Sequence, residues 1–279
     1  MPERPLRIAL LIDADNAPAD LIDEILTELS TLGVINIRRA YGNWTKHALN
    51  GWQSRLLEFA IKPVQQFDYS RRKNATDMAM TIDALDLWYT EQPDAFGIVS
   101  SDADFTPLVM HLRAKGAAVY GFGAQQTPAP FVNACSRFLY LEALAREQAE
   151  ADAQAATHVR LPASSDAKPT KAEKDSESSP APTPTPPPVA RAPLRVPPEK
   201  LRQDTCLIRL LEDAAHAVQD EAGWAGVGAI GTQITNKASF DARNYGYASL
   251  TKLLTATGLF ELRDTGTPHV AVRPKNWRE

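Results

Sequence analysis

The sequence predicts an α/β fold with a doubly wound parallel sheet, followed by a small winged helix-turn-helix domain. Three observations support this prediction. Short apolar runs alternate with segments of helical periodicity over residues 6–122, residues 201–275 combine helical segments with a hairpin turn, and a segment rich in Pro, Ala and Ser separates the two regions. Because each parallel crossover needs a helix to return the chain, this alternation predicts parallel strands with helices on both faces.

The first region is expected to contain five strands, at residues 8–12, 34–41, 61–67, 96–100 and 117–122. Each is a short apolar run bounded by turn residues or by a helical segment. The first helix carries Leu21, Ile25, Leu29 and Leu32 on one face, and Gly33 then ends it. Further helices are expected at residues 51–59, 75–89 and 106–115.

The helix expected at residues 75–89 has an apolar stripe, and this stripe predicts its core face. The stripe consists of Met78, Ile82, Leu85 and Tyr89. At helical spacing, Asp77 abuts this stripe, whereas Asp86 lies on the opposite side of the helix. We therefore expect Asp77 near the core and Asp86 in solvent.

The second region predicts three helices and a hairpin. One helix covers residues 206–218, a second carries Val227, Ile230 and Ile234, and a third carries residues 247–254 before Gly258. Two short apolar runs, 259–262 and 269–272, flank the turn signal Asp264-Thr265-Gly266. Three helices plus a hairpin are typical of a winged helix-turn-helix.

Between the two regions, residues 149–198 are expected to form a disordered linker. The segment includes the run TPTPPP and has almost no large apolar residues. Such a composition cannot bury enough apolar surface to offset the entropy of ordering the chain. The predicted domains are therefore residues 1–148 and 199–279.

Composition narrows the range of functions. The net charge of −4 and the pI near 5.8 argue against unspecific coating of DNA. The two cysteines, Cys135 and Cys206, have no partner at the spacing of a metal knuckle or redox pair, which favours a reducing compartment. The apolar run that begins at Ile8 meets Asp13 and Asp15 too soon for a signal peptide or membrane span. We expect a cytoplasmic protein without membrane association.

Four carboxylates are candidates for a metal site. Asp13 ends the first strand, Asp102 and Asp104 follow the fourth, and Asp77 begins the third helix. They would converge if the first and fourth strands are neighbours, since ligands of open α/β sheets bind at the carboxyl ends of strands. Clustered carboxylates repel one another unless a cation neutralises them, and hard ions such as Mg²⁺ or Mn²⁺ prefer oxygen ligands. The chemistry expected of such a site is metal-assisted phosphodiester hydrolysis.

Each of these acidic positions also has a simpler structural interpretation. A helix cap is the more probable role for Asp15, whereas for Asn16 the cap and the site are equally balanced. Asp77 could merely complement the helix dipole. For Asp104 a capping role is weakened because Thr106 and Pro107 already supply an N-cap and first-turn pair.

The motifs LLIDADN, RRKNATDMAM and IVSSDADFTPLV together resemble the NYN domain, a branch of the PIN-like nuclease superfamily, over residues 6–144. The resemblance implies a PIN-like fold, Mg²⁺ or Mn²⁺ as cofactor, and RNA cleavage. Asp13, Asp77, Asp102 and Asp104 match the acidic positions of the family, and Asn16 and Ser101 match positions beside them. Ser101 stands where many members carry glycine.

Basic and aromatic residues of the first domain are candidate RNA contacts. Arg71, Arg72 and Lys73 directly precede the third helix, where they would place a phosphate backbone beside the acidic residues; a solvated charge run is equally consistent with the sequence. Trp44 follows the second strand and is a candidate for stacking on a base, whereas Tyr41 is expected to pack in the core.

The second region contains the motif NYGYASLTKLL and resembles the LOTUS domain, also called OST-HTH, over residues 201–275. This resemblance implies binding of RNA, with structured or G-rich RNA as the candidates. The alternative that it implies is docking of a protein partner. The candidate RNA contacts are Lys237, Arg243, Asn244, Tyr245 and Lys252.

The leading hypothesis is a metal-dependent endoribonuclease whose second domain recruits structured or single-stranded RNA. The alternative is a non-catalytic RNA-binding adaptor whose acidic pocket binds metal only weakly. A third hypothesis, a phosphatase or nucleotide hydrolase for small substrates, is disfavoured by the tethered RNA module.

Overall fold

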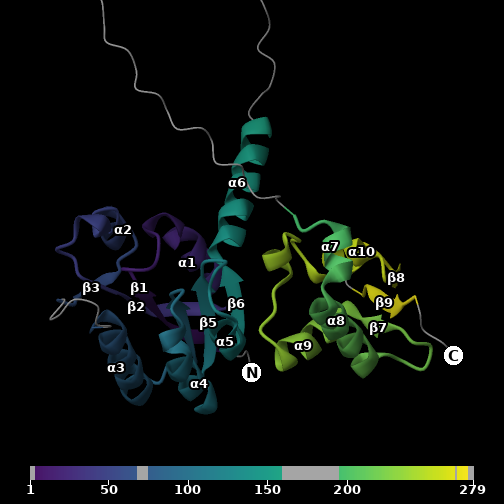
Figure 1. The fold of residues 1–279 in the computed structure, drawn as a ribbon, viewed down its shortest axis with the longest axis horizontal. Coiled ribbons are helices and arrows are strands. Elements are labelled where there is room, and N and C mark those ends of the chain that lie inside the picture. Colours follow the sequence, from purple (N-terminus) through teal and green to yellow (C-terminus); the bar gives the residue numbers. More distant parts are fainter. Residues whose placement is uncertain (1–3, 68–74, 159–194, 268, 276–279) are drawn as a thin grey trace, which may run out of the picture.

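The structure is a computed structural model that describes residues 4–67, 75–158, 195–267 and 269–275, with the backbone alone for 150–158. The first domain is built on a six-stranded sheet in the order β3-β2-β1-β4-β5-β6, with every pair parallel (Figure 1). The strands are β1 (Leu6–Asp13), β2 (Gly33–Gly42), β3 (Lys62–Gln65), β4 (Ala95–Val99), β5 (Ala118–Gly123) and β6 (Arg137–Tyr140).

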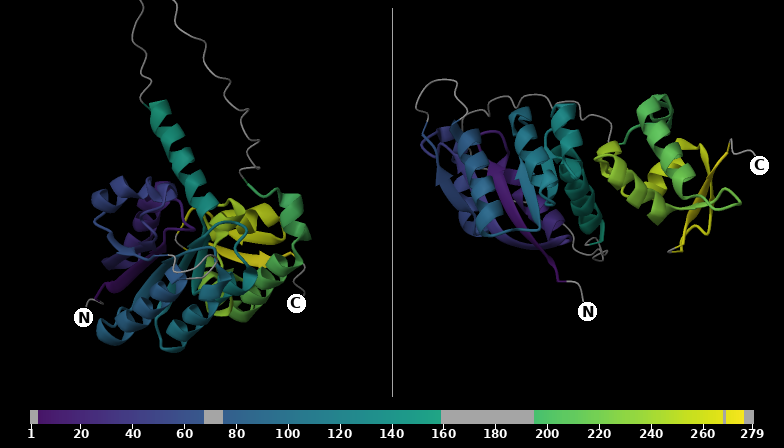
Figure 2. Two further views of the ribbon diagram at one scale, coloured as in Figure 1. Left: turned by 60° about the vertical axis from the view of Figure 1, so that its left-hand side comes forward. Right: turned by 90° about the horizontal axis from the view of Figure 1, so that it is seen from below.

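Helices cover both faces of the sheet, as predicted (Figure 2). Alternate residues of β1 serve the two cores: Ile8, Leu10 and Ile12 face one helix layer, and Ala9 and Leu11 face the other. The first layer contains α1 (Ile22–Ser30), α2 (Trp52–Glu58) and α6 (Leu141–His158), and the second contains α3 (Ala75–Thr90), α4 (Thr106–Ala114) and α5 (Ala129–Ala134). Among the described residues, no helix combines the length and apolarity needed to cross a membrane.

The five predicted strands are confirmed, and three elements are additional. The sequence analysis did not anticipate β6, α5 or the helical part of α6. Strand β6 has only four residues, so its apolar run is too short to separate from loop. Short 3-10 turns lie in the segments that follow β1, β2 and β4. They are η1 (Ala19–Leu21), η2 (His47–Leu49) and η3 (Ala103–Phe105).

The predicted core face of α3 is wrong for Met78, Ile82 and Tyr89, whereas Leu85 is partly buried and packs against the core. Met78, Ile82 and Tyr89 are 62–65% exposed, whereas Met80 and its neighbours on the opposite side are buried. The residues of α3 that are buried are Thr76, Met80, Ala84 and Leu87. At 100° per residue, Met78 lies about 160° from Met80, so the helix is rotated by nearly half a turn from the expected orientation.

A polar contact accounts for this rotation. Asp83 of α3 accepts hydrogen bonds from Arg39 and from the fully buried Tyr41, both on β2. An unpartnered buried tyrosine hydroxyl would be costly, so the contact with Asp83 fixes which side of α3 meets the sheet. The inward side carries Asp77 as well, because Asp77 lies about 60° from Met80. The prediction that Asp77 faces inward is therefore correct, although its stated reason is not.

The second domain has the predicted helices and hairpin. Its antiparallel sheet has the order β7-β9-β8, and the Asp264–Gly266 turn adopts positive φ at Asp264 (55°) and Gly266 (89°). Tyr247 lies before the third predicted helix rather than in it. The elements are α7 (Pro198–Gln203), α8 (Thr205–Val218), α9 (Val227–Lys237), η4 (Ala242–Tyr245), α10 (Leu250–Thr257), β7 (Ala225–Gly226), β8 (Phe260–Arg263) and β9 (Ala271–Pro274).

The predicted linker starts too early. Helix α6 continues to His158, so residues 149–158 are helical instead of disordered. Residues 147–156, with the sequence EQAEADAQAA, are rich in Ala, Glu and Gln, which are strong helix formers. This local preference outweighs the low content of large apolar residues. Residues 159–194 of the predicted linker lie outside the described residues.

The orientation of α3 predicts that two methionines on the same helix contribute very differently to stability. Met80→Ala should lower the free energy of unfolding by about 2 to 5 kcal/mol because it leaves a cavity in the core. Met78→Ala should change it by less than about 0.5 kcal/mol because Met78 is mostly exposed. Urea unfolding of both variants checks this, and a larger loss for Met78→Ala would contradict the assigned orientation.

Candidate acidic site

The acidic residues lie where the order of the strands in the sheet reverses, between β1 and β4. The chain runs from β1 outward through β2 and β3, then crosses to β4 on the other side of β1. In such sheets a crevice forms at the carboxyl ends of the two central strands. Asp13 is the last residue of β1, Asp102 and Asp104 follow β4 at η3, and Asp77 is in the first turn of α3.

Asp13 is a fully buried carboxylate with one satisfied oxygen. Its Oδ2 accepts hydrogen bonds from Ser100 Oγ at 2.9 Å and Asn16 Nδ2 at 2.8 Å. Its Oδ1 is buried and has no hydrogen-bond partner. Burial raises the pKa of Asp13 above its ordinary value, against the opposing effect of the two hydrogen bonds. An unpartnered anionic oxygen in this position destabilises the folded protein unless a cation binds to it.

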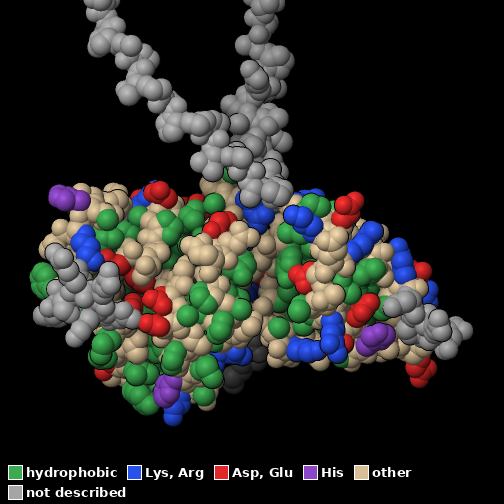
Figure 3. Space-filling view, viewed as in Figure 1, with side chains coloured by type: hydrophobic (Ala, Val, Ile, Leu, Met, Phe, Trp, Pro, Cys, Tyr) green, Lys and Arg blue, Asp and Glu red, His purple; other side chains and the backbone are tan. Residues whose placement is uncertain are grey.

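The carboxylate of Asp77 experiences the charges of the other aspartates. Its pKa is raised to about 6, first by burial and then by repulsion from Asp13, Asp102, Asp104 and Asp15. Charges affect a pKa in this way only when they lie near one another. The other three carboxylates identified from the sequence therefore lie near enough to Asp77 for their charges to act on it, and Figure 3 shows acidic side chains on the surface beside the upper end of α3.

The loop after β4 holds its aspartates by hydrogen bonds within the loop. Asp102 caps η3, since its Oδ1 accepts from the Asp104 amide at 2.8 Å. Thr106, which the sequence suggested as a helix cap, is instead the first residue of α4, and its hydroxyl donates to the Ala103 carbonyl. Asp102 thus combines a cap with a position in the acidic cluster.

The serine in contact with the cluster is Ser100, which the sequence analysis missed. Ser100 is buried, donates to Asp13 and accepts from the Asp102 amide at 3.1 Å, so it links the two strand ends. Ser101, the predicted site residue, accepts from the Ala124 amide at 2.8 Å. Its position in the sequence could have identified Ser100 as a site residue, because it directly follows a fully buried strand, where a polar side chain needs a partner.

Asp15 does not cap a helix. The 3-10 turn that follows has Pro18 at its cap position and no side-chain cap. Asp15 instead accepts hydrogen bonds from Thr76 at 2.9 Å and Lys46 at 3.2 Å. It therefore ties the end of β1 to the start of α3, beside Asp77.

The donor set suits a hard divalent cation, but the described side chains do not form a ready cage. Among them, no three His, Cys, Asp or Glu residues are grouped closely enough to hold a metal ion. The unpartnered Oδ1 of Asp13 and the raised pKa of Asp77 both indicate negative charge that the protein leaves uncompensated. Oxygen ligands with excess negative charge fit Mg²⁺ or Mn²⁺.

The predicted RNA contacts of the first domain fall in different places. Trp44 is half-buried, donates from Nε1 to the Val64 carbonyl at 3.1 Å, and lines a groove of about 570 Å³ with residues of α2 and β3. Tyr41 is in the core, as expected. Arg71, Arg72 and Lys73 lie outside the described residues.

The predicted RNA contacts of the second domain separate into two groups. Lys252 is exposed, and Lys237 is exposed but paired with Asp213 at 2.6 Å. Tyr245 is half-buried, with its ring 6.0 Å from that of Phe240, and burial raises its pKa to about 12. Arg243 and Asn244 contact the first domain, where carboxylates and backbone atoms occupy their hydrogen-bonding groups.

Comparison with known proteins adds three findings. Residues 7–142 match the NYN domain, and residues 202–272 match the OST-HTH/LOTUS domain. An uncharacterized protein of Methanocaldococcus jannaschii is 34% identical over 125 residues, which are 43% of this chain and 48% of that protein, so the chain spans about half the length of this relative. A crystal structure of a protein of unknown function from Vibrio parahaemolyticus is 17% identical, with a TM-score of 0.40, over 50% of this chain and 95% of that one.

NYN domains belong to the PIN-like nuclease superfamily, and the six-stranded parallel sheet is consistent with that fold. OST-HTH/LOTUS domains bind RNA. The chain therefore consists of an NYN domain of PIN-like fold joined to an OST-HTH/LOTUS domain.

Proposed function

We propose that this chain is a divalent-cation-dependent ribonuclease that cleaves RNA at the acidic site. The observation that carries the proposal is the buried, unpartnered Oδ1 of Asp13, together with the charges of Asp13, Asp102 and Asp104 that raise the pKa of Asp77. A protein that needed these residues only for folding would gain by pairing or replacing them, because uncompensated buried charge is destabilising.

The residues take distinct roles in this proposal. Asp13, Asp77, Asp102 and Asp104 would hold Mg²⁺ or Mn²⁺, which supplies an activated water and neutralises charge on the phosphoryl oxygens when bound. Ser100 and Asn16 orient Asp13 by fixing its other oxygen. Such supporting hydrogen bonds keep a ligand in one orientation and tune its basicity.

RNA is the proposed substrate because of the second domain. A tethered RNA-binding module raises the local concentration of RNA at the acidic site. Small phosphate esters would gain nothing from this arrangement, which disfavours a phosphatase.

A non-catalytic RNA-binding adaptor is the second candidate. It is favoured by the lack, among the described residues, of three metal-ligating side chains already grouped for coordination. An adaptor predicts RNA binding that is insensitive to chelator, with no cleavage under any divalent cation.

Cleavage of a mixed, end-labelled RNA pool in Mn²⁺ or Mg²⁺ distinguishes the two candidates. Asp13→Asn and Asp102→Asn should each lower the cleavage rate at least about 100-fold, since each removes a direct ligand charge. Asp102→Asn preserves an oxygen that can cap η3, so its effect would not come from loss of the turn. Asp86→Asn removes an exposed charge from α3 and serves as the matched control.

Products that disappear in both site variants and persist in Asp86→Asn would support the ribonuclease. An RNA mobility shift without products in either metal would favour the adaptor. Equal cleavage by wild type and the double variant Asp13→Asn/Asp102→Asn would rule out the acidic site as the place of reaction.

The raised pKa of Asp77 predicts how stability depends on pH in the presence of EDTA. The folded carboxyl keeps its proton up to a pKa of about 6, whereas the unfolded one releases it near its ordinary pKa of 3.8. The folded state thus binds more protons between these values, and this group makes the free energy of unfolding fall as pH rises through that window.

Asp77→Asn removes this penalty. It should raise the free energy of unfolding at pH 7.5 by about 1 kcal/mol, a figure discounted because the side chain is only half-buried. At pH 3.5 the gain should vanish. Urea unfolding at both pH values measures this, with Asp86→Asn as control; a destabilised Asp77→Asn at pH 7.5 would contradict the account.

A further inference from the structure

The OST-HTH domain lies against the open edge of the NYN sheet, at β6 (Figure 1). An edge strand presents unpaired backbone donors and acceptors. The side-chain amide of Asn244 satisfies one of each: its Oδ1 accepts from the Tyr140 amide at 3.0 Å, and its Nδ2 donates to the Phe138 carbonyl at 3.0 Å. Asn244 therefore pairs with β6 as a neighbouring strand would.

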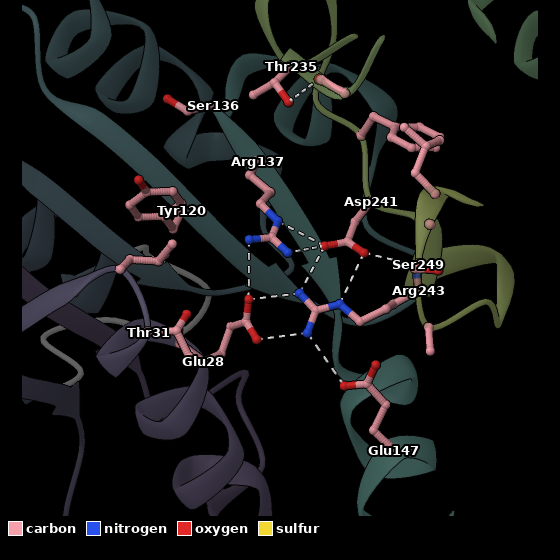
Figure 4. A pocket seen from close by; sticks show the side chains of 16 residues that line it. Glu28, Thr31, Tyr120, Ser136, Arg137, Glu147, Thr235, Asp241, Arg243 and Ser249 are labelled. Carbon is pink, nitrogen blue, oxygen red and sulfur yellow. Dashed lines mark hydrogen bonds and ion pairs between the residues drawn. The ribbon is translucent and has the colours of Figure 1, made fainter. Parts of the chain in front are cut away.

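Beside this contact, charged side chains of the two domains form one network (Figure 4). Arg243 donates to both oxygens of Glu28 on α1, at 2.7 and 2.8 Å. Arg137, at the start of β6, donates to Asp241 at 2.6 and 2.8 Å and lies 3.3 Å from Glu28. Glu147 on α6 also lies 3.5 Å from Arg243. The pairs cross the boundary in both directions: the NYN domain supplies Arg137, Glu28 and Glu147, and the OST-HTH domain supplies Arg243 and Asp241.

The network is shielded from solvent. The side chains of Arg243, Glu28 and Asp241 are 16%, 14% and 5% exposed. The hydrogen bonds from Arg243 are the main cause of the lowered pKa of Glu28, so that carboxylate stays charged at neutral pH. A buried pair of this kind leaves an uncompensated charge when one partner is removed, which makes separation of the domains unfavourable.

The network borders a cavity between the two domains. Its volume is about 740 Å³, and its wall also includes the polar side chains of Thr31 and Ser136 and the apolar side chains of Leu32 and Phe240. A space of this size leaves the domains incompletely packed here, so the charged network and the Asn244 amide are the specific contacts that join them.

From this geometry we infer that residues 241–244 are an intramolecular docking element that fixes the OST-HTH domain on β6 and α1 of the same chain. RNA bound by the OST-HTH domain is then presented to the NYN domain by a single body. Arg243 and Asn244 serve the docking contact, and Lys237 and Lys252 remain as OST-HTH candidates for RNA. The inference does not depend on whether the chain cleaves RNA.

Distance measurement between two spin labels tests the inference in the full chain. One label is attached to the exposed native Cys206 of the OST-HTH domain, and the other to Ser54→Cys on α2 of the NYN domain. Pulsed electron paramagnetic resonance should give one narrow distance distribution. Arg243→Glu, which places like charges at Glu28 and Asp241, should broaden the distribution at least twofold. Arg243→Lys, which keeps the positive charge beside both carboxylates, should broaden it less.

Two controls make the result decisive. Lys237→Glu breaks an ion pair within the OST-HTH domain and should leave the distribution narrow. Dilution of the labelled protein into a tenfold excess of unlabelled protein should change nothing, because both labels report on one chain. A broad wild-type distribution, an unaffected Arg243→Glu variant, equal broadening by Arg243→Lys and Arg243→Glu, or loss of the narrow distance on dilution would each overturn the inference.

Discussion

The burial of the Asp13 carboxylate at the end of the central strand is the constraint on which the acidic site depends. β1 lies between β2 and β4, so nothing but protein surrounds its last side chain. Ser100 reaches this carboxylate from β4, and Asn16 reaches it from the following loop. The same strand pairing that forms the core also places the loop of Asp102 and Asp104 beside the end of β1, and the repulsion that these carboxylates and Asp13 exert on Asp77 is what a cation would relieve.

Hydrophobic patterning was a good guide to elements and a poor guide to orientation. The five strands and the alternation with helices follow from apolar runs. The pairing of β1 with β4 was only a condition for the acidic loops to converge, and the structure shows that these strands are neighbours. The rotation of α3 does not follow, because Met78 and Met80 are equally apolar and long-range polar contacts, those of Asp83 with Arg39 and Tyr41, favour the observed side. A long-range polar contact of this kind leaves no periodic signal in the sequence.

The acidic residues and the basic residues differ in how far sequence could assign them. The four aspartates follow strands or begin a helix at the same edge of the sheet, and this was visible in the sequence because parallel strands end at one edge. Arginine offers the same donors to a phosphate and to a carboxylate, so Arg243 was equally consistent with RNA and with Glu28. Only the arrangement of the two domains distinguishes these partners.

The central claim is that Asp13 Oδ1 marks a divalent-cation site shared with Asp77, Asp102 and Asp104. Anomalous diffraction from crystals grown with Mn²⁺ tests it most directly. The account predicts an anomalous peak within coordination distance of Asp13 Oδ1 and beside at least two of the other three carboxylates. A fully ordered site without a peak at saturating Mn²⁺, or a peak bound only elsewhere on the surface, would contradict it.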